Sequence, residues 1–312
     1  MNQFLTRSRV RSVATTLAVA LTLTFAAAAG YDSQQEPPFP SVKEMLRNTH
    51  IHDQPKLKIG VYTDSPLLGE LRDGNYSGFD IEIARYIADE LGYGAERIEW
   101  VPVATADRIR YLQDGNVDLV VSSFSMTEER EKQVSFAGPY LVTTPETMVP
   151  NRLRDKIRTI EDLRDPKYKV CSSGGSTTEV ELRNHQIKVH PEKTVGDCVR
   201  GILDGRFDAV SSDETILAGF LSEHPKKFTI IDMPFGASEQ IGVGVPMNDP
   251  VLRDLVAFFL YKSYQQGRGE QRTSPWTIAY NQTLGPWLRV PKRQPPPMNP
   301  PKLVDVDEEA PR

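Results

Sequence analysis

Cysteine and histidine are scarce in this chain, and the residue patterns of common enzymes are missing. The 312 residues include two cysteines and five histidines. We find no serine nucleophile elbow, no His-Glu-x-x-His motif and no phosphate loop ending in Gly-Lys-Ser. His50 and His52 form one close pair, and a pair without a third ligand is a poor metal site. We therefore expect no metal, no cofactor and no enzyme activity.

An excess of positive charge is missing as well. The chain has 37 Lys and Arg against 42 Asp and Glu, for a net charge of -5. Nucleic-acid binding needs a concentrated basic face, whereas the basic residues here are dispersed, so we expect no nucleic-acid partner. The hydrophobic share of 39% and charged share of 25% suit one large or two modest globular domains.

The long uncharged run of the sequence lies near its N-terminus. Arg7, Arg9 and Arg11 precede Val13 to Ala29, and Gly30 follows. Basic residues before an apolar run that ends in small residues are the layout of a secretory signal. The run is also just long enough to span a bilayer, so residues 1–30 are either a signal peptide or an uncleaved N-terminal anchor. In both cases the protein is exported, either to the outer face of the cytoplasmic membrane or into the medium.

The rest of the chain divides by composition. Residues 31–56 are polar and show no sustained period, which predicts a tether. The domain is expected to start at Leu57 with a short buried strand and to continue with a helix from Phe79 to Leu91. Another apolar helix is expected from Val251 to Tyr264. Residues 291–312 are proline-rich and then acidic, which predicts a disordered tail.

Two segments of the chain resemble each other. Asp114 to Ser122 and Asp204 to Ser212 each run from the end of a helix through a glycine into a strand that ends in serine. The repetition suggests two similar α/β lobes. An alternative is that the helix, glycine and strand are the ordinary connection of any α/β protein.

The first of these strands leads into a cluster of hydrogen-bond donors. Val117 to Val121 is apolar apart from Asp118. Ser122, Ser123 and Ser125 follow, and Arg130 comes five residues after the last serine. Open α/β sheets bind ligands at the carboxyl ends of their strands, so these groups are expected to converge there. The planar guanidinium of Arg130 suits a carboxylate. An alternative places Arg130 in an exposed run of charges.

The stretch from Ser122 to Tyr140 resembles the ligand-binding segment of the periplasmic polar-amino-acid-binding proteins, the family 3 extracellular solute-binding proteins of ABC importers. The resemblance covers roughly residues 57–290 and implies an α/β fold of the two-lobed type II class. Each lobe would be a mixed sheet flanked by helices, with residues 57–146 and 242–290 in lobe 1 and residues 147–241 in lobe 2. A monomer would close on an amino acid in the cleft and deliver it to an ABC permease.

The resemblance also implies which residues bind the ligand backbone. Arg130 matches the arginine that binds the α-carboxylate, with Ser123 and Ser125 beside it. A second-lobe loop adds the contacts of Ser176 and Thr177. Asp213 matches the aspartate that accepts hydrogen bonds from the ligand ammonium group. From the residues alone, Asp213 could instead cap the next helix, and Ser176 with Glu179 fits a capping box.

The remaining site residues concern the ligand side chain. Arg108 and Thr105 lie in a segment that resembles the one by which acidic-amino-acid binders reach the distal carboxylate, which favours glutamate or aspartate. An alternative places Arg108 on a solvated helix face. Tyr62 and Asp64 match a position that contacts the ligand side chain. That position lacks the further arginine of some dicarboxylate binders.

Cys171 and Cys198 are expected to form a disulfide, since an isolated pair in an exported protein is more often a disulfide than a metal site. Two other functions stay open. The lobes of an anchored protein could report amino-acid levels to a membrane partner. A dehydratase-type enzyme could also use this scaffold, and it would need a general acid or base in the cleft.

Overall fold

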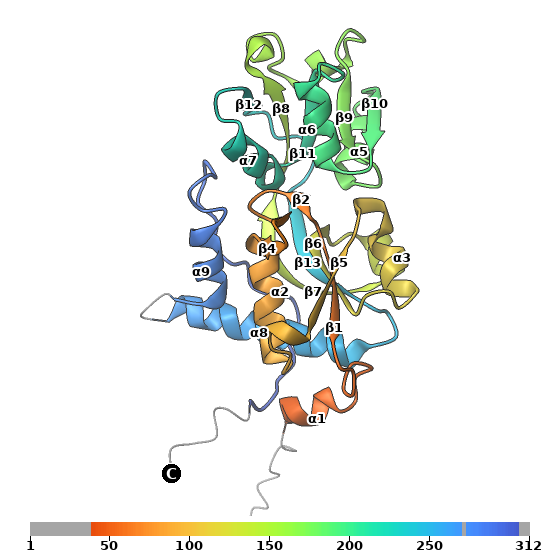
Figure 1. Cartoon of the computed structure of the whole chain (residues 1–312), viewed down its shortest axis with the longest axis vertical. Coiled ribbons are helices and arrows are strands. Elements are labelled where there is room, and N and C mark those ends of the chain that lie inside the picture. Colours follow the sequence, from red (N-terminus) through yellow and green to blue (C-terminus); the bar gives the residue numbers. More distant parts are fainter. Residues whose placement is uncertain (1–38, 270–272, 306–312) are drawn as a thin grey trace, which may run out of the picture. The chain divides into compact units, whose positions relative to one another are not determined.

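The computed structural model describes residues 39–269 and 273–305, which contain two five-stranded sheets (Figure 1). The predicted signal or anchor segment, residues 1–30, lies outside the described residues. Among the described helices, none is long and apolar enough to cross a membrane.

The first sheet has the order β5-β1-β6-β13-β7 and is mixed. Strands β1, β5 and β6 run parallel, and β13 is antiparallel to both β6 and β7. Alternate residues of β6 enter two clusters: Leu119 and Val121 pack with helices α2 and α8, whereas Val120 and Phe124 pack with Leu112 of α3. Helices therefore cover both faces. The bounds are β1 Leu57–Val61, β5 Ile98–Pro102, β6 Leu119–Ser125, β7 Ser135–Thr143, β13 Glu239–Val245, α2 Phe79–Glu90, α3 Arg108–Gln113 and α8 Pro250–Arg268.

The second sheet has the order β10-β9-β11-β8-β12 and is also mixed, because β8 is antiparallel to its neighbours. Val210 packs with apolar residues of α6 and α7, and Ala209 packs with Leu182 of α5 on the opposite face. The predicted fold class is confirmed: two lobes, each a mixed sheet flanked by helices. The bounds are β8 Pro145–Pro150, β9 Val170–Ser173, β10 Val189–Glu192, β11 Ala209–Asp213, β12 Phe228–Ile231, α5 Thr177–Asn184, α6 Val195–Leu203 and α7 Glu214–Glu223.

The remaining elements are short. A three-stranded sheet, β2-β3-β4, lies on the chain between β1 and α2. The bounds are α1 Val42–Leu46, β2 Asp64–Ser65, β3 Gly69–Arg72, β4 Asn75–Ser77, α4 Glu128–Glu131, α9 Pro275–Gln282 and the 3-10 turns η1 Ala95–Arg97, η2 Thr105–Asp107, η3 Asn151–Leu153 and η4 Ile160–Arg164.

The helix predictions and the repeated motif are confirmed. The two expected apolar helices are α2 and α8, and α8 begins where Asp249 accepts a hydrogen bond from the Leu252 N–H. Gly115 and Gly205, which end α3 and α6, have φ angles of +69° and +75°. These left-handed angles favour glycine and release the chain into β6 and β11.

The chain crosses between the lobes twice. It leaves the first sheet at Thr143 and enters β8 at Pro145, and it returns from β12 to β13 at Glu239. Glu239 and Thr143 are register partners, so the two crossing strands run side by side. The crossings lie slightly earlier in the sequence than the predicted positions after residues 146 and 241, because Glu146 already pairs with Ser212 in the second sheet.

The prediction of a tether is wrong for residues 39–56, which pack on the first lobe. This segment contains α1, and Ile51 is fully buried. The Tyr93 hydroxyl donates to the Ile51 carbonyl, and the His50 ring lies between Asp118 and Asp249. Val42, Met45 and Leu46 of α1 also pack on the first-lobe core at helical spacing, but this helix has only five residues and so gives no sustained hydrophobic period.

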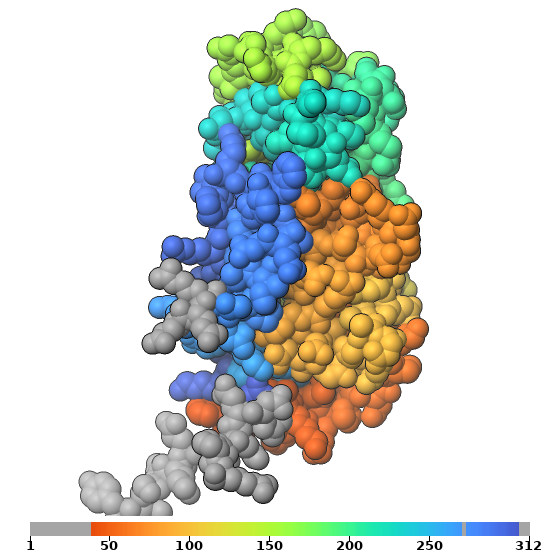
Figure 2. Space-filling view, turned by 60° about the vertical axis from the view of Figure 1, so that its left-hand side comes forward, coloured from red at the N-terminus to blue at the C-terminus, as the bar shows by residue number. Residues whose placement is uncertain are grey.

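The prediction of a disordered tail is likewise wrong for residues 291–305. The Met298 N–H donates to the Gly138 carbonyl at 2.7 Å, and Val304 forms a bridge with Ser41. Gln294 bonds to α8 through the Leu260 carbonyl. These hydrogen bonds, together with Leu303 packed on the core, hold the segment although it has no continuous hydrophobic face. Near the start of this segment, Lys292 forms an ion pair of 2.9 Å with Glu214 of α7. In Figure 2 the blue C-terminal part of the chain lies against the cyan part of the second lobe.

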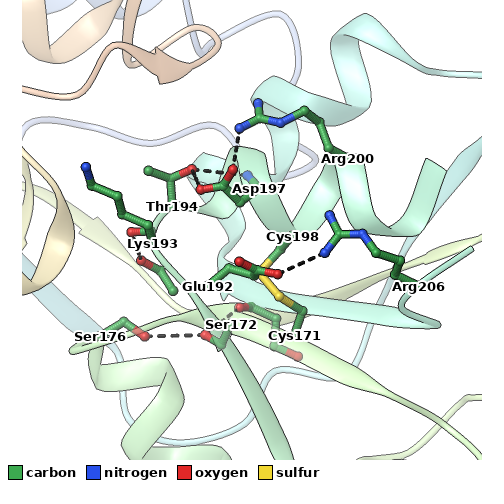
Figure 3. The surroundings of a disulfide bond; sticks show 12 residues. Cys171, Ser172, Ser176, Glu192, Lys193, Thr194, Asp197, Cys198, Arg200 and Arg206 are labelled. Carbon is green, nitrogen blue, oxygen red and sulfur yellow. Dashed lines mark hydrogen bonds and ion pairs between the residues drawn. A yellow bond between two sulfur atoms is a disulfide. The ribbon is translucent and has the colours of Figure 1, made fainter. Parts of the chain in front are cut away.

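The predicted disulfide between Cys171 and Cys198 is confirmed, with the two Cα atoms 5.6 Å apart. It joins the beginning of β9 to α6 (Figure 3). Ser172 follows Cys171 directly and shares a hydrogen bond with Ser176, so the disulfide anchors the strand that leads into the second-lobe loop.

Candidate ligand-binding site

Two buried arginines lie together at the carboxyl end of β6. Arg108 begins α3 and is 2% exposed, and Arg130 on α4 is 8% exposed. Their guanidinium carbons lie 4.4 and 5.2 Å from the centroid of the Phe124 ring, within the range of cation–π attraction. The alternatives that placed either arginine on a solvated surface are therefore wrong.

Arg108 holds the loop after β6 in place. Its Nε donates to the Thr105 carbonyl, and its Nη1 donates to the Ser122 and Ser123 carbonyls, each at 3.0 Å. A guanidinium has five N–H donors. The two on Nη2 have no hydrogen-bond partner among the described residues, so they can serve a ligand.

Arg130 links the two lobes. Its Nη1 donates to the Ser125 carbonyl at 2.9 Å, and its Nη2 donates to the Gly175 carbonyl of the second lobe at 3.2 Å. Burial and the charge of Arg108 lower the pKa of Arg130 to about 10. An anion that joined the two arginines would relieve this repulsion.

Asp213 supplies a buried acceptor at the end of β11. It is 6% exposed, and its Oδ1 has no hydrogen-bond partner among the described residues. Its side chain makes no capping bond to α7, so the alternative role as a helix cap is not observed. Burial, together with the negative charge of Glu239, raises its pKa well above the ordinary value. A cation that bonded to Asp213 would favour the charged form.

Glu239 accepts hydrogen bonds from the hydroxyls of two predicted site residues. Its Oε2 accepts from the Ser125 hydroxyl of the first lobe and from the Thr177 hydroxyl of the second lobe, the latter at 2.8 Å. A cavity of about 340 Å³ lies beside this cluster. Its lining comes from both lobes and from the second crossing segment, and includes Ser125, Thr127, Thr177, Glu181 and Glu239.

A chain of hydroxyl groups joins the lobes near Arg108. Thr105 shares a hydrogen bond of 2.9 Å with the Tyr62 hydroxyl and accepts one of 2.8 Å from Ser173 of β9. Tyr62 and Thr105 are therefore in contact, and their role around a ligand side chain stays a prediction. Arg108 lies over the Tyr62 ring, 5.9 Å from its centroid.

Ser123 turns its hydroxyl toward the protein interior. Its N–H and Oγ both bond to Oδ2 of Asp80, at 2.8 and 3.2 Å, and the Tyr140 hydroxyl donates to Oδ1 at 2.9 Å. Its φ of +42° is left-handed, a strained angle for a residue other than glycine. Burial raises the pKa of Asp80 to about 6, although these hydrogen bonds oppose the rise. Ser123 thus uses its N–H and its hydroxyl to bond Asp80 and its carbonyl to bond Arg108, so it positions these two side chains.

Two other predicted site residues, Ser176 and Asp64, form hydrogen bonds with residues other than the two arginines. Ser176 accepts from the Glu179 N–H at 2.9 Å and so caps α5, while the Glu179 carboxylate bonds to Gly175 instead of closing the predicted capping box. Asp64 accepts from the Thr194 hydroxyl at the start of α6, a contact between the lobes. Burial raises the pKa of Asp64.

Four residues of this site are not among the predicted ones: Glu239, Asp80, Phe124 and Ser173. Asp80 lies in the first turn of α2, where an acidic residue is favourable in itself, so its sequence position gives no sign of burial. Glu239 follows a stretch without hydrophobic period, and only the register of β13 with β7 brings it between the lobes.

The paired crossing strands, with buried charges of both signs between two mixed sheets, define a two-lobed binding protein of type II. Comparison with known proteins confirms the resemblance inferred from Ser122 to Tyr140. The chain belongs to the bacterial extracellular solute-binding proteins, family 3, whose model matches residues 57–278.

Individual relatives agree with this assignment. The chain is 32% identical over 222 residues to the glutamate-binding protein GluB of Corynebacterium efficiens, which covers 67% of this chain and 74% of that protein. It is 29% identical over 240 residues to the ABC transporter glutamine-binding protein GlnH of Bacillus subtilis, with 75% and 86% covered. The crystal structure of the solute receptor for L-cysteine of Neisseria gonorrhoeae matches with a TM-score of 0.68 and 26% identity, covering 76% of this chain and 93% of that chain.

Proposed function

We propose that this protein captures an α-amino acid between its lobes and delivers it to an ABC importer. The observation that carries the proposal is the buried Oδ1 of Asp213, which has no hydrogen-bond partner among the described residues; burial raises the Asp213 pKa, and the nearby charges of Arg108 and Arg130 oppose that rise. An amino acid has one cationic and one anionic group, which would pair with Asp213 and Arg130. Charge-assisted bonds in a cleft shielded from water are strong and directional.

We further propose that the ligand is glutamate or aspartate. The Nη2 donors of Arg108 suit a second carboxylate, and Thr105 and Tyr62 lie beside that arginine. The glutamate-binding relative supports this choice, while the glutamine-binding relative makes glutamine the main competitor. Glutamate has about ten heavy atoms, so micromolar affinity needs about 0.8 kcal/mol per atom, which is below the ceiling for very small ligands.

Calorimetry of the purified protein with glutamate, aspartate, glutamine and arginine tests both statements. We expect micromolar binding of an acidic amino acid and weaker binding of glutamine and arginine. Tighter binding of glutamine or arginine would overturn the specificity alone. Absence of binding by every amino acid tested would overturn the function.

One observation favours a second candidate, an enzyme of the dehydratase type. Asp213 is a buried carboxyl group with a raised pKa in the cleft, which is the property that a general acid needs. Mass spectrometry of a bound carboxylated ring compound distinguishes the two functions, because an enzyme converts it and a binding protein returns it unchanged.

A further inference from the structure

We propose that Glu239 is an internal competitor for the ligand carboxylate and thereby sets the affinity and charge preference of the site. This inference rests on the proposed function. It starts from the two hydroxyls that Glu239 holds, those of Ser125 and Thr177. Both belong to residues expected to contact the α-carboxylate of an amino acid. A ligand carboxylate beside Arg130 must therefore take these donors from Glu239.

Glu239 lies where its carboxylate can be replaced by a ligand carboxylate. It is the first residue of β13, and it pairs with Thr143 on the other crossing strand. Its single Oε2 atom joins Ser125 of the first lobe to Thr177, the first residue of α5 in the second lobe. The side chain thus holds the two walls of the cleft together in the way that a ligand carboxylate would.

The electrostatic surroundings agree with this role. The charge of Glu239 raises the pKa of Asp213, and it opposes the lowering of the Arg130 pKa by burial and by Arg108. The carboxylate therefore acts on the same two groups that an amino acid would join. It also adds negative charge to the cleft, which disfavours a ligand with a net negative charge more than a neutral zwitterion.

The test is calorimetry of the Glu239→Gln variant with glutamate and glutamine. A neutral amide accepts hydrogen bonds about half as strong as those of a carboxylate, so the variant competes less well for the two hydroxyls. We expect the affinity for glutamate to rise about tenfold and that for glutamine to rise less, because the variant also removes charge repulsion. Unchanged or weaker glutamate binding would overturn the proposal.

A matched control is Glu181→Gln. Glu181 lines the same cavity, but its partners are Asn184, the last residue of its own helix, and His185, which follows it. An equal rise in affinity in this variant would mean a general charge effect and would overturn the competitor role.

Glu239→Asp keeps the charge but is one methylene shorter, so it should reach the two hydroxyls poorly and also bind glutamate more tightly. A fall in its affinity would contradict the proposal.

The outcomes separate this inference from the proposed function. If the parent protein binds an amino acid and Glu239→Gln binds it no better, only the competitor role fails. If the parent binds no amino acid, both fail.

Thermal unfolding of each variant confirms folding, and small-angle X-ray scattering without added amino acid gives a second readout. We expect a larger radius of gyration for Glu239→Gln than for Glu181→Gln, because only the former weakens a link between the lobes, and equal radii would contradict that link.

Discussion

Asp213 and Arg130 both carry charges that burial makes costly. The pKa of Asp213 is raised and that of Arg130 is lowered to about 10, mainly because each side chain is desolvated. A protein selected for stability alone would replace such groups with apolar ones. Their retention in one cleft is typical of a binding site, where a ligand supplies the missing partners.

The Asp213→Asn variant separates binding from stability. We expect its affinity for the amino acid to fall by about 2–5 kcal/mol, since a buried charged partner is lost. Its free energy of unfolding should instead rise, by about 1–3 kcal/mol at neutral pH, because burial of an unpaired carboxylate no longer opposes folding. Calorimetry and urea denaturation give the two values.

The pH dependence of this stabilisation has a fixed sign. The folded pKa of Asp213 is raised, so the stability linked to it is fully present below about pH 3.9, the ordinary pKa of an aspartate, and is lost as pH rises through the folded pKa. The advantage of Asp213→Asn should therefore be larger at pH 8 than at pH 5. The exposed Asp73 provides the control Asp73→Asn, and an equal gain there would contradict the argument.

The site could be predicted from sequence only where its groups follow a strand directly. Serines at the end of β6 and an arginine five residues later indicated a carboxylate site but left an exposed run of charges open for Arg130, and the family resemblance favoured Arg130 and added Asp213. Asp80 and Glu239 could not be found in this way. Their burial depends on Ser123, Tyr140 and Thr177, which are far from them in sequence.

At the scale of elements, the helices α2 and α8 and the paired glycine turns were predictable because each has a local signal. The segments at the two ends of the domain were not. Residues 39–56 and 291–305 are held by the five-residue helix α1 and by scattered contacts, such as the bridge of Ser41 with Val304, and these leave no sustained periodic pattern. Composition alone therefore suggested a tether and a disordered tail.

His50 is expected to make the attachment of the N-terminal segment pH-dependent. Its ring bonds to Asp249 at 2.6 Å and to Asp118 at 3.0 Å, and these carboxylates raise its pKa, the Asp118 hydrogen bond most strongly. Stability from a raised histidine pKa is fully present below about pH 6.5 and is lost as pH rises through the folded value.

Urea denaturation of His50→Gln checks this expectation. The variant should be less stable than the parent at pH 6 by about 1 kcal/mol, a value reduced for the partial exposure of the ring. The deficit should shrink at pH 9. His52→Gln is the control, because within the described part of the chain the His52 ring pairs with the exposed Asp53 alone. A deficit that grows with pH would contradict the role of His50.

The disulfide is expected to stabilise the second lobe. Cys171 and Cys198 are separated by 27 positions in sequence, and a cross-link of this span contributes about 3–4 kcal/mol in the chain-entropy model. Urea denaturation of the double variant Cys171→Ala, Cys198→Ala should show a loss of this size. A reductant should destabilise the parent and leave the double variant unchanged. An equal effect on both proteins would argue against the disulfide as the cause.

At the scale of the whole molecule, the lobes meet through contacts that do not involve a ligand. They include Ser173 with Thr105, Arg130 with Gly175, Thr194 with Asp64, and Arg72 with Glu223. The C-terminal segment adds ion pairs of Arg289 with Glu146 and of Lys292 with Glu214. Burial raises the pKa of Glu146 to about 7. If the proposed lobe closure occurs, it would depend on these surfaces on both sides of the cleft.

Gly219 offers a test of that dependence. A Cβ atom at this position of α7 would lie 1.9 Å from the Pro66 carbonyl oxygen of the first lobe. Gly219→Ala should hold the lobes apart, increase the radius of gyration and lower ligand affinity by at least about tenfold, or about 1.4 kcal/mol. In the control Gly267→Ala on α8, the nearest atom is the Ser274 hydroxyl at 3.2 Å. Equal affinities for the two variants would contradict closure at Gly219.

The central claim is that the cleft recognises both charged groups of an α-amino acid. Calorimetry with glutamate, glutarate and γ-aminobutyrate tests it most directly, because glutarate lacks the α-ammonium group and γ-aminobutyrate lacks the α-carboxylate. Each analogue leaves either Asp213 or Arg130 buried without its partner. We predict that both bind at least about 100-fold more weakly than glutamate. An analogue that binds as tightly as glutamate would contradict the account.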